Sequence, residues 1–532
     1  MAFSVFQAAT TLYGLDQRGT PVALTLPTGV SLDTNKRLRG AVFGNYAVLV
    51  NSPNRPITVD ANLNVRPLCP LPPSIKPTSA ASSGAGGLTG KYRAKQTYRI
   101  SDVFGRLIAE SDYGPVSDEA SLAAKLLALS ALQLSNETIS SHGLYRNTNA
   151  GDVYFKWLEL DGNTQTSIED DLADAGLSIF AAPSLGTPPD MYLLAEFRSR
   201  LFGVSKADID NLRFSEIGAM YAWPSANSEP VPRIGSDNRG ITGFARKRDA
   251  LGVGRSNGFY QFTGTTSATF KFVNVSENCG VEAPDSVAVY RDIAYFLWKD
   301  GVYRWAIGGI QCISDEKIRR WFTSNDTFNL QRLQHAFAII DPFTRRYKLF
   351  LASAGSTIED CWIEYDIDQN KWWGPHTSHA FNPSAAFYHS TDSGLVIPVV
   401  GGTDGYVRRE RKKRTDDTNT GIDFDLVTNR DASGSTDEKF HGELSVAGKP
   451  QAGGTLVVQT TAGDLNELRK VSPGEKNAQT IESEMDLTQS VETLDRVGEG
   501  QAFKIRFRNN QPGEDVNLCG YEVDNVFSLG RR

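Results

Sequence analysis

The sequence lacks the features of a membrane-spanning or disulfide-stabilised protein. No apolar stretch approaches the roughly 20 residues that cross a bilayer. The N-terminal segment MAFSVFQAATTLYG has no basic region and no long apolar core, so we expect no signal peptide. The five cysteines are odd in number, widely spaced and without any CxxC pair. Because the six histidines do not join them at ligand spacing, we expect no zinc site and unpaired, mostly buried thiols at Cys69, Cys279, Cys312, Cys361 and Cys519.

Motifs of the common enzyme families are also missing. The chain contains no GxSxG, HExxH or Walker A sequence and no GxGxxG that opens a helix. The glycine-rich run LGVGRSNG (251–258) lies between two strand patterns and predicts a hairpin turn. Adjacent acids point to opposite faces of a strand, so they predict solvated loops and not an acid–base pair. We therefore expect no enzyme, no catalytic residue, no metal and no cofactor, and solvated acids at Glu169, Asp170, Asp171, Asp315 and Glu316.

The charge balance is mildly acidic. A net charge of −7 and a pI of about 5.6 argue against a broad basic surface that grips nucleic acid. They are compatible with a protein that lets DNA slide past it.

Strand patterns dominate the sequence. Apolar and polar residues alternate in short runs, and turn residues separate the runs every 8–12 positions, which is typical of all-β proteins. Asp300-Gly301 between two such runs is a strong hairpin signal. The predicted strands include 44–50, 56–60, 259–264, 268–275, 286–290, 294–298, 302–307, 345–352 and 361–367.

A coarser period of very roughly 40–55 residues lies over these strands and is typical of β-propeller blades. One large β-sandwich with long loops is the alternative. The Pro/Ser/Gly/Ala-rich segment 72–90 predicts a linker, and prolines at 183, 188 and 189 close the segment that follows it. The run SLAAKLLALSALQL (121–134) fits either a helix or a strand.

These patterns define the expected domains. Residues 1–86 and 181–407 form the propeller, residues 87–180 form an inserted β-sandwich that we expect to be separable, and residues 408–532 form a C-terminal β-domain. Length alone favours two to four domains.

Four further groups of residues could carry function, and each also has a structural explanation. The segment 236–244 partly matches the Asp-box of sialidases through Ser236, Gly240 and Thr242, but Asn238 and Gly243 replace two key residues. His376 and His379 could hold a metal or lie at a blade edge. The basic run Arg408 to Arg414 could bind phosphate or form a solvated linker. Seven aromatic residues could stack on sugars or pack between blades, namely Trp298, Tyr303, Trp305, Trp362, Tyr365, Trp372 and Trp373.

Three segments resemble one protein family when they are taken in order. Residues 198–224, 240–264 and 283–305 are similar to successive blades of the tail hub and nozzle proteins of short-tailed bacteriophages, the family of tail tubular protein B and the packaged-DNA stabilisation hubs. Residues 87–180 resemble the fibronectin type III-like insertions of such proteins through TYRISDVFGRLIAESDYGPVS and GLYRN. In the first segment the matching residues are Arg200, Leu201, Phe202, Leu212, Arg213, Phe214, Ser215, Trp223 and Pro224.

The resemblance implies a non-enzymatic virion protein of the phage tail that is assembled in the host cytoplasm. Its implied form is a homo-oligomeric ring, commonly a hexamer, below the portal and the tail adaptor and near fibre or spike proteins. Double-stranded genomic DNA would be retained by this ring and would pass through it at ejection without sequence-specific binding.

Two further expectations concern function. If DNA passes through a ring of this chain, acidic and polar side chains should line the lumen, because each basic contact to a phosphate would hold the DNA. A few basic residues could still act as a brake, and Arg408 to Arg414 is the only dense candidate. The alternative function is a carbohydrate- or receptor-binding propeller.

Overall fold

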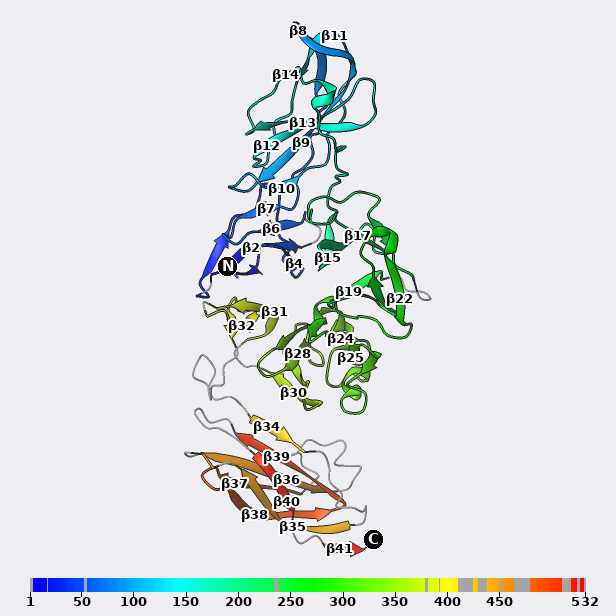
Figure 1. The fold of residues 1–532 in the computed structure, drawn as a ribbon. Coiled ribbons are helices and arrows are strands. Elements are labelled where there is room, and N and C mark those ends of the chain that lie inside the picture. The colour runs from blue at the N-terminus through cyan, green and yellow to red at the C-terminus, as the bar shows by residue number, and fades with distance from the viewer. Residues whose placement is uncertain are drawn as a thin grey trace. The chain divides into compact units, whose positions relative to one another are not determined.

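A computed structural model gives the fold of the chain (Figure 1). Contacts divide the chain into two compact units, residues 1–409 and residues 410–532. The structure describes residues 3–16, 18–51, 55–233, 239–377, 381–391, 393–409, 424–428, 438–448, 450–451, 454–463, 479–509, 518–523 and 527–530. Strands make up nearly all of its regular structure, which confirms the all-β class.

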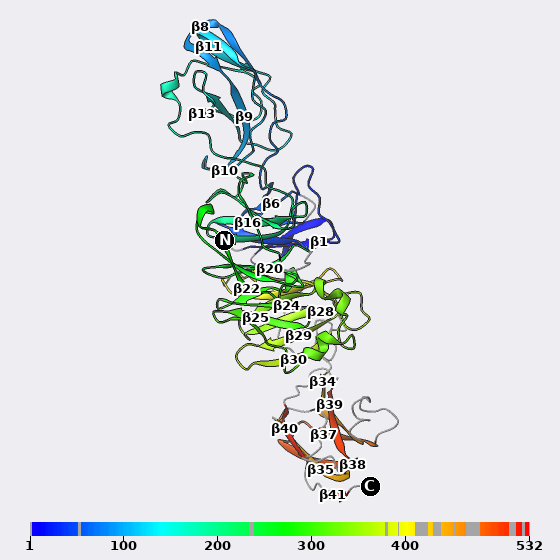
Figure 2. The same ribbon diagram turned by 90° about the vertical axis from the view of Figure 1, so that its right-hand side faces the viewer.

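The first unit contains seven small antiparallel sheets, here called the seven-sheet body (Figures 1 and 2). Each is a meander in which consecutive strands pair. The first and last sheets have three strands and the others have four. In chain order they are β1 (Ser4–Ala8), β2 (Thr11–Leu15) and β3 (Pro21–Leu24); β4 (Arg39–Phe43), β5 (Tyr46–Val50), β6 (Ile57–Val59) and β7 (Val65–Pro67); β15 (Met191–Phe197), β16 (Arg200–Ser205), β17 (Asn211–Phe214) and β18 (Ser228–Pro230); β19 (Ile241–Arg246), β20 (Leu251–Arg255), β21 (Phe259–Thr263) and β22 (Lys271–Ser276); β23 (Ala288–Tyr290), β24 (Ile293–Trp298), β25 (Gly301–Ala306) and β26 (Gly309–Cys312); β27 (Phe337–Asp341), β28 (Arg346–Leu351), β29 (Cys361–Asp366) and β30 (Lys371–Thr377); β31 (Pro383–Ser390), β32 (Val396–Gly402) and β33 (Val407–Arg409).

All the strands predicted above appear, with small shifts at their ends. Two predictions about turns are wrong in detail. Gly301 pairs with Trp298, so the two-residue turn between β24 and β25 is Lys299-Asp300. The glycine-rich run at 251–258 is mostly strand β20, because Gly252 and Gly254 leave room for Phe259, Trp305 and Val281 to pack against the backbone. Only its last residues turn into β21.

The first strands of the seven sheets connect the sheets in a circle of contacts. Strand β4 contacts β15, then β15 contacts β19, β19 contacts β23, β23 contacts β27, and β27 contacts β31. Strand β31 contacts β1, where Phe6 stacks on Phe387 with 5.9 Å between ring centroids and the Ser4 hydroxyl donates to the Tyr388 carbonyl at 3.1 Å. A hydrophobic cluster that includes Leu12 and Leu49 joins the first sheet to the second. Every sheet therefore has a neighbour on each side.

Residues between β7 and β15 form two more sheets that share one hydrophobic cluster. Strand β8 and its partner β11 correct the sequence analysis. Most of the predicted linker 72–90 belongs to β8, because its small residues allow close pairing with β11, and Leu88 and Tyr92 bury their side chains. The run at 121–134, left open above, is mainly strand β11. The strands are β8 (Thr78–Tyr92), β9 (Ala94–Ser101), β10 (Leu107–Glu110), β11 (Ala120–Ser130), β12 (Ser141–Asn147), β13 (Tyr154–Asp161) and β14 (Ile168–Asp170), in the orders β10-β9-β12-β13 and β14-β11-β8.

The inserted segment packs firmly on the body. Ile100, Ile108 and Ala109 share a buried cluster with Met191 and Trp223 of the body. The Tyr113 hydroxyl donates to the Pro183 carbonyl at 2.8 Å. Deletion of residues 87–180 would expose this apolar surface. That the body stays folded without the segment remains a prediction, which thermal melting of the deletion variant tests.

The second unit holds two further sheets over one hydrophobic cluster. Their strand orders are β34-β39-β36-β37 and β38-β35-β40, and β41 also pairs with β35. The strands are β34 (Phe424–Val427), β35 (Glu438–Gly448), β36 (Thr455–Gly463), β37 (Gln479–Asp486), β38 (Val491–Gly500), β39 (Ala502–Asn509), β40 (Leu518–Val523) and β41 (Phe527–Gly530).

Helical structure in the described residues is limited to short turns. Among them no helix is both long and apolar enough to cross a membrane. The helical elements are α1 (Arg319–Thr323) and the 3-10 turns η1 (Asp174–Gly176), η2 (Ser267–Thr269), η3 (Pro284–Ser286) and η4 (Leu330–His335).

Candidate functional site

A cavity of about 1070 Å³ lies where the first strands of the seven sheets meet. Six of the seven sheets contribute residues to its wall, the segment at η3 before the fifth sheet contributes Pro284 and Asp285, and the segment between β3 and β4 crosses it. Its polar wall residues include Gln7, Lys36, Arg37, Arg39, Asp285 and Ser384, and its aromatic ones include Phe6, Tyr13, Phe244, Phe337, Phe387 and Tyr406.

The centre of the polar wall is a carboxylate held by two arginines. Arg39, the first residue of β4, donates from Nε and Nη2 to the two carboxylate oxygens of Asp285 at 2.6 and 2.9 Å. Its third nitrogen, Nη1, donates to the Tyr192 carbonyl at 2.9 Å. Arg37 Nη1 lies 3.5 Å from Asp285. Two arginines at and just before the start of β4 therefore meet one carboxylate of η3, the turn before β23, and Arg39 also reaches β15 through the Tyr192 carbonyl.

Arg37 extends this network toward the last two sheets. Its Nε donates to the Ser384 carbonyl at 2.9 Å, and its Nη1 donates to the His335 carbonyl at 2.5 Å. Its Nη2 lies 3.4 Å from Glu359, and its guanidinium lies 4.4 Å from the centre of the Phe337 ring. The arginine thus ties the start of β4 to β27 and β31.

Electrostatics keep this network ionised. Burial alone would raise the pKa of Asp285, but Arg39 and then Arg37 hold that pKa below its ordinary value. Burial lowers the pKa of His335, and the positive charge of the neighbouring Arg332 lowers this pKa further. Both arginines donate their hydrogen bonds to carboxylates and carbonyls of other sheets and segments. This geometry therefore holds the sheets together and does not position a group for proton transfer.

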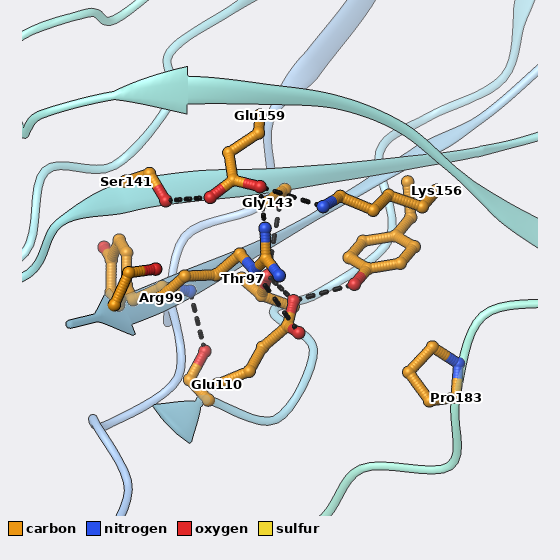
Figure 3. Close-up of polar contacts among 12 residues, drawn as sticks. Thr97, Arg99, Glu110, Ser141, Gly143, Lys156, Glu159 and Pro183 are labelled. Carbon is orange, nitrogen blue, oxygen red and sulfur yellow. Dashed lines mark hydrogen bonds and ion pairs between the residues drawn. The ribbon is translucent and has the colours of Figure 1, made fainter. Parts of the chain in front are cut away.

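A second buried charge network lies in the inserted segment (Figure 3). Arg99 of β9 forms ion pairs with Glu159 and, at 3.5 Å, with Glu110. Glu110 is 2% exposed and accepts hydrogen bonds from the Thr97 and Tyr145 hydroxyls, both at 2.7 Å. Burial, and then Glu110, raise the pKa of Tyr145.

The outer side of this network is anchored at Glu159. Its carboxylate accepts from the Ser141 hydroxyl at 2.6 Å and from Lys156 at 2.9 Å (Figure 3). Each acid therefore has both a cationic partner and a hydroxyl donor, as the acids of structural networks commonly have. Among the described residues, the buried Nε of Arg99 has no hydrogen-bond partner.

At position 143 this network leaves room only for glycine. A Cβ at this position would lie 2.4 Å from the Thr97 hydroxyl oxygen and 3.0 Å from Glu110 Oε1. We expect Gly143→Ala to lower the free energy of unfolding of the inserted segment by about 2 kcal/mol, as overpacking commonly does. Gly308→Ala, where a Cβ meets no atom within 4 Å, should change it by less than about 0.5 kcal/mol. Denaturant titration measures both, and equal effects would show that the clash is relieved at no cost.

The acids noted in the sequence have structural partners. Glu169 accepts from the Ser82 hydroxyl at 2.7 Å, whereas Asp170 lies 3.2 Å from Arg146. The two neighbours thus engage different partners. Asp171 accepts from the Gly87 amide, and Asp315 pairs with Arg319 at 2.5 Å.

The remaining sequence candidates do not come together in one site. The described end of the Asp-box-like segment leads into β19, and Ser236 and Asn238 lie outside the described residues. His379 also lies outside them, while the His376 ring packs 5.5 Å from Trp362. In the described parts of the chain no group of three metal-ligating side chains is present.

The aromatic residues and the basic run have different environments. Trp305 contacts Phe259 of the neighbouring sheet, as expected for packing between sheets, whereas Trp373 is 45% exposed. Arg408 and Arg409 belong to β33, so this end of the run is not a linker. Arg408 is already paired with Asp404 and stacks 4.4 Å from the Phe381 ring. Residues 410–414 lie outside the described residues.

The thiols follow the prediction where the structure describes them. Cys69, Cys279, Cys312 and Cys361 are unpaired, and all but Cys312 are buried. Sequence reasoning missed Arg37, Arg39 and Asp285, which lie in segments without a known motif. The available signal was the RLR sequence at 37–39, two arginines at strand spacing directly before an apolar strand.

Comparison with known proteins adds little to this description. No family model and no curated protein matches the chain. Among solved structures, the chain is similar to PorZ, a bacterial surface component of the type-IX secretion system of Porphyromonas gingivalis. The sequences are 11% identical, the match covers 76% of this chain and 70% of PorZ, and the TM-score is 0.27.

Proposed function

We propose that the seven sheets form a seven-bladed β-propeller, with the inserted segment as a fibronectin type III-like sandwich. The chain of strand contacts from β4 through β31 to β1, together with the hydrophobic cluster that joins the first and second sheets, supports this architecture. Propellers close in this way, with the first strand of each blade facing a central channel. In this arrangement, Arg37 and Arg39 stand at the channel and join blades far apart in the sequence.

We propose further that the chain is a structural protein of a short-tailed phage tail, a hub or nozzle that forms an oligomeric ring, a hexamer by family resemblance. The ring would lie below the portal and adaptor, continue the DNA channel, and retain the genome until ejection. The proposal depends on the positions of the three segments that resemble the hub and nozzle family. Residues 198–224, 240–264 and 283–305 fall on three successive sheets, in the same order as in the family.

The residues of the resemblance are core residues of the fold. Arg200 donates to the Ser215 carbonyl at 2.6 Å, and Ser215 Oγ accepts from the Leu201 amide at 3.0 Å. Trp223 is 1% exposed. The resemblance therefore concerns the scaffold and supports a shared architecture.

Charge is distributed unevenly along the chain. The body (1–77 and 181–409) carries 31 basic and 27 acidic residues, whereas 78–180 carries 8 and 13, and 410–532 carries 16 and 22. The excess acid thus lies in the two added parts. We propose that these parts supply the acidic lining expected of a channel that does not hold DNA.

The oligomeric state of the purified chain tests this function. We expect closed rings of several copies, formed by the chain alone or after addition of its tail adaptor, in light scattering and negative-stain images. Isolated single copies at every concentration and with the adaptor present would contradict the proposal.

The cavity favours a second candidate, a carbohydrate-binding propeller. Phe6 stacks on Tyr13 and on Phe387 beside the polar wall, and aromatic faces beside polar groups suit sugars. Titration with a panel of host-surface glycans checks this candidate. The carbohydrate-binding candidate would be favoured over the nozzle if a glycan binds, if Tyr13→Ala abolishes that binding, and if the chain forms no oligomeric ring.

A further inference from the structure

A row of arginines occupies successive hairpin tips at one end of the body. The turns that join the first two strands of four consecutive sheets contain Arg198, Arg248, Arg291 and Arg345. All four side chains belong to exposed residues. Because each turn joins the first and second strand of its sheet, the four tips occupy equivalent places in the fold.

Contacts between the turns show that they lie next to one another. Arg246, at the end of β19, pairs at 2.6 Å with Glu196 beside the first turn. The Arg248 amide donates to the Asp292 carboxylate of the next turn at 2.7 Å. Strand β23, which leads into the third turn, contacts β27, which leads into the fourth. The tips therefore form a continuous row, here called the arginine row.

The backbone at these tips makes arginine an unexpected choice. Arg198, Arg291 and Arg345 have φ values of 52°, 48° and 54°. This left-handed region favours Gly, Asn and Asp. Arginine recurs there in three turns although better turn residues exist, which points to a use of its side chain.

Three members of the row are available to a partner. Arg198, Arg248 and Arg291 make no ion pair with any residue that the structure describes, and Arg198 and Arg291 rest against the rings of Phe197 and Tyr290. Arg345 is engaged by Asp368 at 2.6 Å. By contrast, Arg408, the first residue of the basic run considered in the sequence, is already paired with Asp404.

We propose that the arginine row binds the phosphate backbone of duplex DNA. A guanidinium matches phosphate oxygens with paired donors, which an ammonium does not, and a row of single charges suits the regular charges of a duplex. This proposal deepens the proposed function and rests on it, because that function brings DNA to the chain. With only three free contacts on a chain of net charge −7, the row would act as a weak brake and not as a tight grip.

The test measures binding of the full chain to a fluorescent 30-base-pair duplex by anisotropy at 50, 100 and 200 mM NaCl. Three phosphate contacts predict a slope of about −2.7 in log K against log salt, and so about 40-fold weaker binding at 200 than at 50 mM. The variant Arg198→Asn/Arg248→Ser/Arg291→Asn should lose most of this slope and at least tenfold in affinity at 50 mM. Asn preserves the left-handed turns.

A matched variant controls for net charge. Lys271→Ser/Lys299→Ser/Arg320→Ser removes three exposed cations from other parts of the body and should leave binding within about twofold. An equal loss in both variants, or unchanged binding in the first with its melting temperature intact, would overturn the proposal. Tighter binding of dextran sulfate than of DNA at equal charge would do the same. The measurement of oligomeric state does not depend on the DNA-binding measurement. Failure of the proposed function can therefore be told apart from failure of the arginine-row proposal.

Discussion

Replacing Arg39 by methionine should destabilise the seven-sheet body by about 3 kcal/mol, the lower end of the cost of removing one partner from a buried ion pair, because the Asp285 side chain is 19% exposed. Arg39 makes both short bonds to Asp285 and one to the Tyr192 carbonyl. Its loss leaves Asp285 with Arg37 alone, at 3.5 Å. Denaturation followed by tryptophan fluorescence measures the change, and Arg18→Met, at an exposed position, should change stability by less than about 0.5 kcal/mol.

Two companion measurements separate charge from packing. The double variant Arg39→Met/Asp285→Leu should recover part of the loss, because no charge is then left buried. The pKa of Asp285 is depressed in the folded state, so its contribution is present above the unfolded value near 4 and is lost as pH falls through the folded pKa. Asp285→Asn should remove this part of the acid sensitivity. A double variant as unstable as the sum of its parts would contradict the ion-pair explanation.

Replacing Arg146 by methionine should have a similar effect on the inserted segment, about 3–4 kcal/mol. The Arg146 side chain is fully buried and lies 3.2 Å from Asp170 and 2.7 Å from Asp174. Its guanidinium also packs 5.3 Å from the Tyr92 ring. Methionine fills much of the volume but leaves the carboxylate of Asp170, which is 10% exposed, without a cation.

Hydrogen exchange can localise this effect. Protection should fall in β12 to β14 and stay unchanged in β19 to β22. The control is Arg106→Met, because the Arg106 side chain is 76% exposed in its pair with Asp102 and such pairs contribute at most about 1 kcal/mol. If Arg106→Met and Arg146→Met lower stability equally, the burial of the ion pair does not explain the effect of Arg146→Met.

The sequence predicted those parts of the fold that local patterns determine. Short apolar runs bounded by turn residues mark β24, β25 and β28 almost to their ends, because most residues of β24 and β28 are buried. Strand β8 was missed because Ser, Ala and Gly provide no such apolar run. It exists through its pairing with β11, which starts some 30 residues further along the chain.

The candidate site could not be predicted for a related reason. Arg39 and Asp285 are 246 positions apart, and no local spacing signals that the circle of sheets brings them together. Arg99, Glu110 and Glu159 likewise lie on three different strands. The arginine row is visible in the sequence only as single arginines in separate turns, and it becomes a surface only when four sheets stand next to one another.

A cryo-EM reconstruction of the virus particle that contains this chain tests most directly the proposal that the chain forms a tail nozzle. We predict a closed ring of this chain below the adaptor, with DNA density on its axis, acidic and polar side chains along most of the lumen, and the arginine row as a local contact. A lumen lined throughout by Lys and Arg, or single copies standing as spikes on the outer surface, would contradict the nozzle and favour the receptor-binding alternative.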